Sequence, residues 1–319
     1  MFERFLNDPP SQPTLLAPER SWPRAAHLWS RDEMEALAVA GFSGRPLLIR
    51  GEPGTGKSQL ARAAAAMLGW RFDYEVVTPR LEPQDLLWRY DTVRRLAAAQ
   101  GKDHQVGDDL DYVTPGLLWR AIDPVSAARA GNPVPRRSEP DHRSCVVLLD
   151  EIDKADTDLP NTLLEVLGNR GFKTPWLDVP QRAESADTAA APPRGLLVII
   201  TSNDERELPL AFMRRCVVLD LVVPDEGADE NRFVDWLFER GRAQHAELGD
   251  DVLKEAAAMV RDDRNLLPAG QGPRPGLAEY LDLLRTLQEI GRSKEPSAQA
   301  LQPIDWLHRL GRYVLRKQP

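Results

Sequence analysis

A glycine-rich segment near residue 50 has the composition of a phosphate-binding loop. It reads GEPGTGKS from Gly51 to Ser58 and fits the pattern G-x-x-x-x-G-K-S/T. Glycines at this spacing let backbone N–H groups converge on an anion, and a following helix adds its dipole. Lys57 is then expected to reach the β- and γ-phosphates of ATP, and the Ser58 hydroxyl to ligate Mg2+. The expected nucleotide-binding residues are Gly51, Glu52, Pro53, Gly54, Thr55, Gly56, Lys57, Ser58 and Gln59.

Two adjacent carboxylates follow the apolar run SCVVLL, at Asp150 and Glu151. Such a run is typical of a buried strand, so both carboxylates are expected at its carboxyl end. Beside a phosphate-binding loop, Asp150 can hold the Mg2+ shell while Glu151 polarises the attacking water. Carboxylates also end strands at a protein surface, and we interpret the nearby Asp153 and Asp156 as solvated charges at the start of a helix.

Four further residues could act on a nucleotide. Asn203 follows another apolar run, and its amide can orient water or contact the γ-phosphate. Arg214 and Arg215 precede a later strand, where either could stabilise the charge on a transferring phosphoryl group, from its own or a neighbouring subunit. Their alternative role is that of surface arginines at a helix C-terminus. Arg274 precedes a strong helical pattern and is a candidate for reaching the γ-phosphate from a second domain.

Five short apolar segments alternate with helical patterns, which predicts a five-stranded parallel sheet flanked by helices. Pro83 to Ala99 is predicted to be mostly helical, with Leu86, Val93 and Leu96 on its apolar side. After Pro224 only helical patterns occur. We therefore predict a flexible arm at 1–22, an α/β nucleotide-binding domain at 23–224 and a smaller all-helical lid domain at 225–319. The predicted strands are 45–50, 71–78, 144–149, 195–201 and 216–223.

Composition limits the function classes. The formal net charge is −8 and the pI is about 5.3, which makes a nucleic-acid or anionic-membrane partner unlikely, because such partners need clustered basic residues. Neither a bilayer-spanning apolar stretch nor a signal peptide is evident, so a cytoplasmic protein is expected. Cys145 and Cys216 each open an apolar run and are expected to be reduced core residues on neighbouring strands.

The order of these motifs resembles that of the AAA+ superfamily and, within it, of the MoxR-like ATPases. The resemblance is carried by GRPLLIRGEPGTGKSQLA, VVLLDEIDKAD and VIITSNDERELPLAFMRRC, and covers residues 23–285. It also includes 78–100 and 112–122, which resemble the stretch that MoxR-like proteins carry between the two Walker motifs. The resemblance implies Walker A at Gly51 to Ser58, Walker B at Asp150 and Glu151, sensor 1 at Asn203, the arginine finger at Arg215 and sensor 2 at Arg274. The prolines and glycine around Arg274 depart from the usual sensor 2 pattern.

The resemblance further implies a homo-oligomeric ring, commonly a hexamer, with ATP bound between subunits. MoxR-like ATPases act as chaperone-like remodellers, often with a partner that carries a von Willebrand factor A domain, and some belong to bacterial conflict systems. Three hypotheses follow. The first is an ATP-driven motor that remodels a client protein, the second a nucleotide-dependent assembly switch or scaffold with slow hydrolysis, and the third a nucleic-acid motor.

Overall fold

The computed structural model describes most of the chain as two compact units, each of which is described here by itself. We call them the sheet unit (Met1–Asp8, Arg31–Arg50 and Ala64–Leu219) and the helical unit (Pro9–Ser30, Gly51–Ala63 and Asp220–Pro319). The segments 130–143 and 181–194 are rich in Pro, Ala and charged residues, which predicts exposed loops. Both lie almost wholly outside the described residues, as does 225–229, next to the predicted division at 224. The described residues are 2–19, 22–100, 107–131, 144–156, 158–169, 171–175, 178–179, 195–224, 230–266, 274–293, 295 and 301–315.

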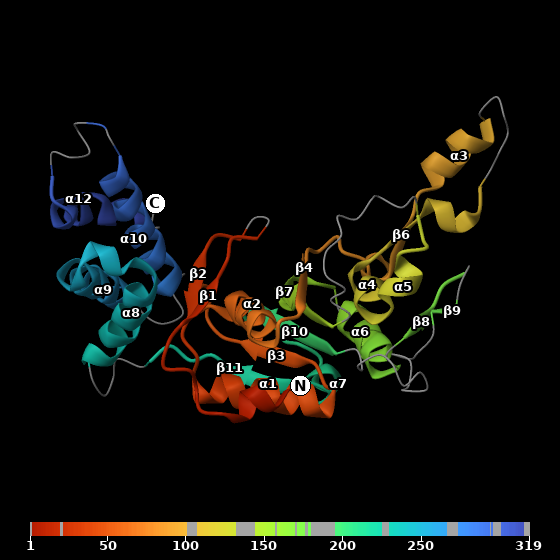
Figure 1. The fold of residues 1–319 in the computed structure, drawn as a ribbon, viewed down its shortest axis with the longest axis horizontal. Helices are drawn as coiled ribbons and strands as arrows, with labels where there is room; N and C mark the ends of the chain where they lie inside the picture. The colour runs from red at the N-terminus through yellow and green to blue at the C-terminus, as the bar shows by residue number, and fades with distance from the viewer. Residues whose placement is uncertain are drawn as a thin grey trace. The chain divides into compact units, whose positions relative to one another are not determined.

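A five-stranded parallel sheet forms the centre of the sheet unit (Figure 1), as the alternating apolar runs predict. Its strand order is β11-β3-β10-β7-β4, so β10 is paired on both sides. The middle strands are almost completely buried, because helices and loops cover both faces. The strands are β3 (Leu47–Arg50), β4 (Arg71–Val76), β7 (Cys145–Asp150), β10 (Leu196–Ser202) and β11 (Val217–Asp220).

The register of the sheet aligns the carboxyl ends of its strands. Ser202 at the end of β10 pairs with Arg50 at the end of β3. On the other side of β10, Ile200 pairs with Leu149 of β7. The residues that follow these pairs are therefore delivered to one edge of the sheet, where functional groups of open α/β sheets gather.

Helices of the sheet unit pack on this framework. Helix α1 packs against β3 and β10, whereas α4 packs against β4 and β7. Beneath α4 the indole of Trp119 is fully buried and donates to the Ser126 hydroxyl at 2.8 Å, so its polar atom is satisfied in the core. Helix α2 begins at the end of the glycine-rich loop. The helices are α1 (Arg31–Ser43), α4 (Leu117–Ile122), α5 (Pro124–Ala127) and α6 (Asp158–Asn169), while α2 (Lys57–Leu68) begins in the helical unit and ends in the sheet unit.

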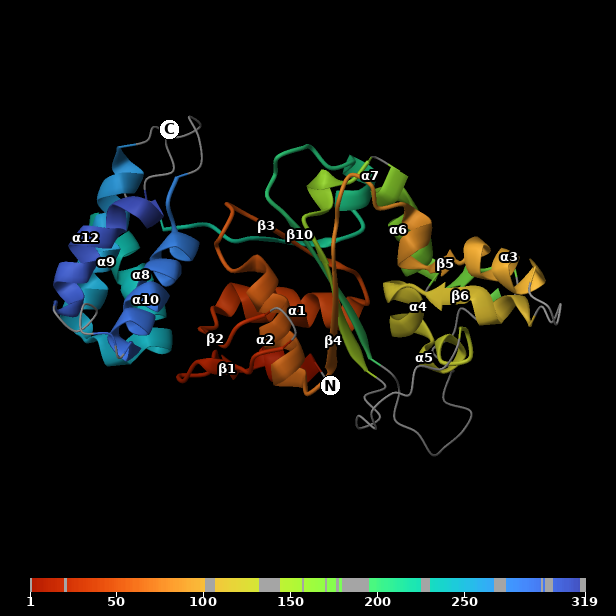
Figure 2. The same cartoon turned by 90° about the horizontal axis from the view of Figure 1, so that it is seen from above.

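The segment 83–99 is mostly helical, as predicted, but its helical structure is not continuous. Strand β5 interrupts it and pairs in antiparallel fashion with β6, beside α4 and α5 (Figure 2). The pairing partner lies more than twenty residues along the chain, so helical periodicity within 83–99 cannot reveal it. Leu86 is buried as predicted, but Val93 and Leu96 are 77% and 59% exposed. The elements here are η2 (Pro83–Leu86), β5 (Trp88–Tyr90), α3 (Thr92–Gln100), η3 (Asp109–Tyr112) and β6 (Val113–Pro115).

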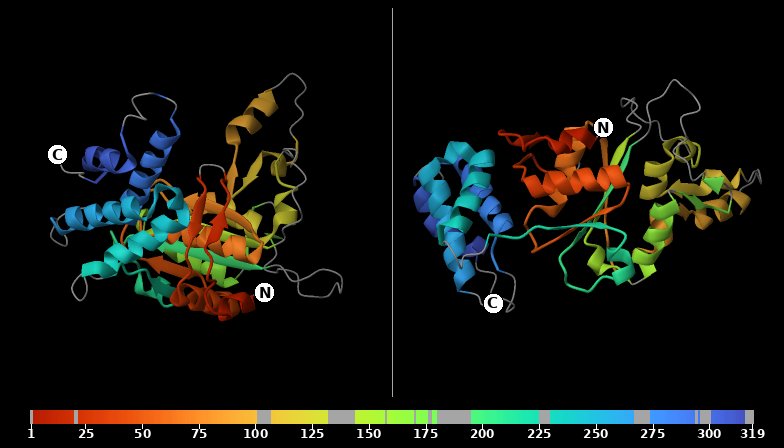
Figure 3. Two further views of the ribbon diagram at one scale, coloured as in Figure 1. Left: turned by 60° about the vertical axis from the view of Figure 1, so that its left-hand side comes forward. Right: turned by 90° about the horizontal axis from the view of Figure 1, so that it is seen from below.

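After residue 224, where only helical patterns occur in the sequence, the described residues of the helical unit form helices that pack side by side and appear cyan to blue in Figure 3. Their shared core includes Phe233, Tyr280 and Leu307, all fully buried. No helix among the described residues has the length and apolar content that crossing a membrane requires. The helices are α8 (Glu230–His245), α9 (Asp250–Asn265), α10 (Leu277–Arg292) and α12 (Pro303–Leu315), with the turn η5 (Ala246–Leu248) between the first two.

Residues 1–22, predicted as a flexible arm, contain two short elements, and a third follows directly after them. In the sheet unit, η1 (Phe2–Leu6) packs on α1 and buries Phe5. In the helical unit, β1 (Thr14–Leu16) pairs with β2 (Ala25–His27).

Both cysteines are free and buried, as predicted, but they do not lie on neighbouring strands. Cys145 opens β7 and Cys216 directly precedes β11, so two strands separate them in the sheet. Burial raises the thiol pKa of Cys145 to about 12 and that of Cys216 to about 11. Both thiols therefore remain protonated at neutral pH and serve as core side chains.

Candidate functional site

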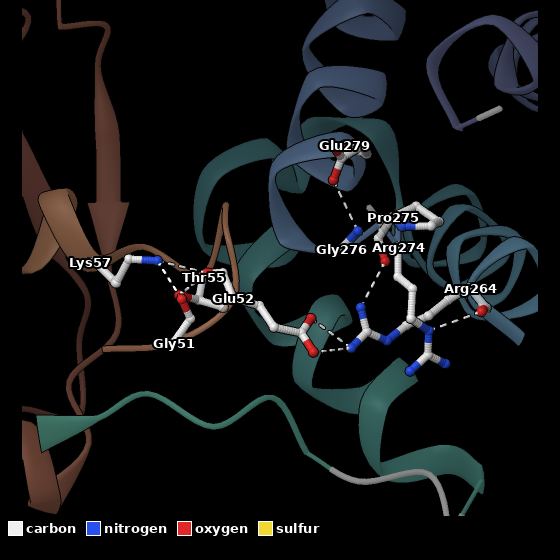
Figure 4. Close-up of polar contacts among 9 residues, drawn as sticks. All are labelled: Gly51, Glu52, Thr55, Lys57, Arg264, Arg274, Pro275, Gly276 and Glu279. Carbon is white, nitrogen blue, oxygen red and sulfur yellow. Dashed lines mark hydrogen bonds and ion pairs between the residues drawn. The ribbon is translucent and has the colours of Figure 1, made fainter. Parts of the chain in front are cut away.

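The glycine-rich loop lies in the helical unit and leads from the end of β3 into α2. Lys57 is the first residue of α2 and its side chain is buried. Its ammonium group donates to the carbonyls of Gly51 and Glu52 at 2.7 and 2.8 Å (Figure 4). The Thr55 hydroxyl donates to the same Glu52 carbonyl at 2.9 Å. These bonds close the loop around a helix N-terminus, the backbone arrangement that favours an anion.

Two of the glycines are required by this loop. Gly54 has φ +78°, and a Cβ there would come within 2.7 Å of the Ala278 Cβ. Gly56 has φ +100°, a conformation that L side chains rarely adopt, although a Cβ there would meet nothing within 4 Å. A larger residue at position 54 would therefore meet both backbone strain and a steric clash, whereas a larger residue at position 56 would meet backbone strain alone.

Ser58 and Gln59 lie in the first turn of α2, where the sequence places them beside a nucleotide. The Gln59 amide donates to the Ala26 carbonyl of β2 at 2.9 Å. One turn later, Arg62 donates to the carbonyl of Ala17 at 2.9 Å. Both side chains thus attach the β1–β2 hairpin to the helix that follows the loop.

The acidic pair lies in the sheet unit and is held by Thr201 of β10. The Thr201 hydroxyl accepts the Glu151 backbone N–H at 2.9 Å and donates to Asp150 Oδ1 at 2.5 Å. Thr201 is fully buried, and Glu151 has left-handed backbone angles, φ 62° and ψ 51°. Such a conformation costs a non-glycine residue on the order of 1–3 kcal/mol and persists only where its surroundings enforce it. The Thr201 hydroxyl supplies part of that constraint.

The Glu151 carboxylate has two polar neighbours. Lys154 Nζ lies 2.6 Å from Oε2, and Asn203 Nδ2 donates to Oε1 at 3.4 Å. The hydrogen bond to Glu151 raises the pKa of Lys154 above its ordinary value. The structure therefore brings together three of the predicted site residues, Asp150, Glu151 and Asn203, and adds Lys154.

The prediction that Asp153 is a solvated charge is wrong. Its side chain is buried, because the turn η4 (Ile152–Lys154) directs it inward. Oδ2 accepts the backbone N–H groups of Asn203 and Glu205 at 3.1 and 3.0 Å. Oδ1 is buried without a hydrogen-bond partner in the described part of the chain. Asp153 thus fixes the backbone at Asn203, whereas Asp156 is exposed as predicted.

Arg214 and Arg215 directly follow α7 (Leu210–Met213), and both side chains are exposed. Their backbone is held by Arg45, which precedes β3. Arg45 donates to the carbonyls of Arg214 at 2.6 Å, Arg215 at 3.1 Å and Cys216 at 2.6 Å. One guanidinium group therefore fixes the turn that presents both arginines, and the geometry favours neither of them.

In the helical unit, Arg264 of α9 is the arginine that reaches the glycine-rich loop. Its Nη2 donates to both carboxylate oxygens of Glu52, at 3.0 and 2.7 Å (Figure 4). Arg274 contacts Arg264: its Nε donates to the Arg264 backbone carbonyl at 3.2 Å. The run RDDRN around Arg264 has the composition of a solvated helix end, and no signal in the sequence distinguishes this arginine.

The described residues form no group of three or more His, Cys, Asp or Glu side chains that could hold a metal ion. Mg2+ at a nucleotide does not need such a group, because this ion is usually held by one or two protein ligands together with substrate phosphates and water.

Comparison with known sequences identifies the family. The AAA domain (dynein-related subfamily) matches residues 46–216, more than half of the chain. The chain belongs to this family. AAA+ P-loop ATPases bind nucleotide, typically with Mg2+, and usually assemble into rings. The match includes the glycine-rich loop, the acidic pair, Asn203 and both Arg214 and Arg215.

Individual relatives are distant. A mitochondrial Lon protease homolog from Yarrowia lipolytica is 27% identical over 209 residues, which cover 60% of this chain and 14% of that protein. Two solved RuvB variants of Thermotoga maritima are 13% and 15% identical, each with a TM-score of 0.43. They cover 88% of this chain and 68% and 67% of their own chains. The chain thus spans a small part of the Lon homolog that it matches.

The Thr201 contacts generate a test. Thr201→Val keeps the side-chain shape but removes the acceptor of the Glu151 N–H and the donor to Asp150. We expect the free energy of unfolding to fall by about 1–3 kcal/mol, the cost of leaving a buried polar group unpaired. Chemical denaturation measures this, with Thr201→Ser as the control that keeps the hydroxyl. Equal stability of the two variants would show that the hydroxyl does not hold the acidic turn.

Proposed function

We propose that the chain binds Mg-ATP through Gly51 to Ser58 and hydrolyses it with the carboxylate pair at Asp150 and Glu151. The observation that carries this proposal is the register of the sheet. β3, which leads directly into the loop, lies beside β10, and β10 lies beside β7, which ends at the carboxylates. The strand end that precedes the loop and the strand end that carries the carboxylates therefore share one edge of the sheet.

Each group has a role in this proposal. Lys57 contacts the β- and γ-phosphates, and the loop N–H groups bind the phosphate oxygens. Ser58 and Asp150 are the residues that would hold Mg2+, which neutralises charge on the phosphates when bound. Glu151 accepts a proton from the attacking water, and the Asn203 amide orients that water.

Arg215 is proposed as the finger that stabilises the transferring phosphoryl group in a neighbouring subunit, with Arg214 as the alternative. Both are exposed, and a finger must be accessible to a neighbour. Arg45 holds their backbone by three hydrogen bonds, which limits the orientations of the turn. Arg274 is proposed as sensor 2, the arginine that reaches the γ-phosphate.

We propose a MoxR-like role, an ATP-driven ring that remodels a client protein in the cytoplasm. The ring is proposed as a hexamer, with a von Willebrand factor A domain protein or a conflict-system component as partner. The motif order given above supports this proposal. The alternative is a nucleotide-dependent switch or scaffold whose slow hydrolysis times assembly. A nucleic-acid motor is disfavoured by the net charge of −8.

Co-purification and ATPase assays distinguish these roles. For a remodeller, we expect a protein that co-purifies with the chain to raise steady-state ATP turnover. A switch would instead form an ATP-locked ring with little turnover at any partner concentration. Stimulation by DNA or RNA, with no response to the co-purifying protein, would contradict the remodelling proposal.

The roles of Lys57 and Glu151 predict different defects. Lys57→Ala should abolish ATP binding, because it removes the cation that faces the terminal phosphates. Glu151→Gln should bind ATP and stay in the assembled form, because only the water-activating carboxylate is lost. Titration with a fluorescent ATP analogue and a steady-state ATPase assay measure the two effects. The division of roles would be wrong if both variants lost nucleotide affinity equally.

If Arg215 is the arginine finger, two inactive variants should complement each other in one ring. Arg215→Ala should bind ATP normally but hydrolyse it about a thousandfold more slowly, the low end for arginine fingers. Mixing it with Lys57→Ala subunits should restore part of the activity, because the Lys57 variant lends an intact arginine to a neighbour with an intact loop. Sedimentation with a slowly hydrolysed ATP analogue verifies assembly and subunit exchange. No recovery in exchanging rings would place Arg215 in its own subunit's site or in a structural role, and Arg214→Ala would be tested next.

A further inference from the structure

Arg264 is a buried cation whose charge partner lies in the glycine-rich loop. Its side chain is only 6% exposed and belongs to the last turn of α9. The guanidinium contacts both oxygens of Glu52, donates to the Pro275 carbonyl at 3.2 Å and lies 5.4 Å from the Phe233 ring centroid. A buried charge is tolerated when it is paired and hydrogen-bonded, and removing one partner leaves the other uncompensated. Arg264 and Glu52 are therefore interdependent.

Glu52 is an unfavourable residue for an anion site. Its backbone carbonyl accepts Lys57 Nζ at 2.8 Å, so Glu52 belongs to the loop proposed to surround a polyphosphate, and its side chain is 51% exposed. A carboxylate in such a loop disfavours an anionic ligand, because like charges repel each other. In the structure, both oxygens of that carboxylate face Arg264, which cancels its charge locally.

We propose that Glu52 and Arg264 form a charge-compensating pair that sets the phosphate affinity of the loop. In this inference, which rests on the proposed nucleotide site, Arg264 acts by neutralising Glu52 and by holding the loop against α9. It is a positioning residue and needs no contact with the phosphates. The pair also gives the helical unit an electrostatic link to nucleotide binding through its own helix.

Charge compensation predicts that one substitution suppresses another. Arg264→Gln should weaken binding of a fluorescent Mg-ATP analogue about tenfold, because the Glu52 carboxylate then repels the phosphates. Glu52→Gln should bind the analogue at least as tightly as the unmodified protein. The double substitution, which removes both charges, should return the affinity to within about twofold of the unmodified protein. Arg264→Lys keeps the charge without the planar fork, so its loss should be less than that of Arg264→Gln.

The matched control is Arg261→Gln, in the same helix, where the arginine pairs with Asp262 at 2.8 Å. Its affinity should match that of the unmodified protein, and circular dichroism checks the fold of every variant. A double variant as weak as Arg264→Gln would overturn the inference and leave Arg264 as a packing residue. The inference would also be overturned if Arg264→Lys bound the analogue as weakly as Arg264→Gln. This comparison remains informative even if the glutamine variant is destabilised. If the unmodified protein did not bind nucleotide, both the inference and the proposed function would fail.

Discussion

Strand β10 has the most constrained position in the sheet unit, because it is hydrogen-bonded to β3 on one side and to β7 on the other. A slip of one residue would turn each of its side chains to the opposite face. Such a slip would move Thr201 away from the acidic turn and would bury Ser202 differently against its neighbours. The apolar side chains on both faces therefore fix the register, and the register in turn fixes where the Thr201 hydroxyl lies.

Buried polar side chains hold the backbone at the ends of these strands. Thr201 bridges Asp150 and Glu151, and Asp153 fixes the backbone of Asn203 and Glu205. Each contact uses a buried side chain to hold a backbone that local propensity alone would not favour, most clearly the left-handed Glu151. The acidic turn is thus constrained before any ligand binds, which reduces the reorganisation that hydrolysis would need.

The strands of the sheet could be predicted from the sequence because β3, β7, β10 and β11 are apolar runs that end in a polar residue and β4 alternates apolar with polar residues. The β5–β6 hairpin could not be predicted, because its short strands pair with residues far along the chain. Asp153 was predicted to be solvated because it lies among other acidic residues, whereas its burial depends on the turn that follows β7. Cys145 and Cys216 open similar runs, but only the strand order shows that two strands separate them.

Arg264 illustrates the limit of sequence reasoning about charge. Arg274 is conspicuous because it stands between prolines ahead of a helix, whereas Arg264 lies among aspartates that could pair with it in solvent. The structure instead buries Arg264 and pairs it with Glu52, more than two hundred residues earlier in the chain. Burying Arg264 costs desolvation free energy, whereas Glu52 is 51% exposed, so stability alone does not explain the pair. The proposed role in offsetting the charge of Glu52 would explain it, because an uncompensated carboxylate in a phosphate-binding loop would disfavour the ligand.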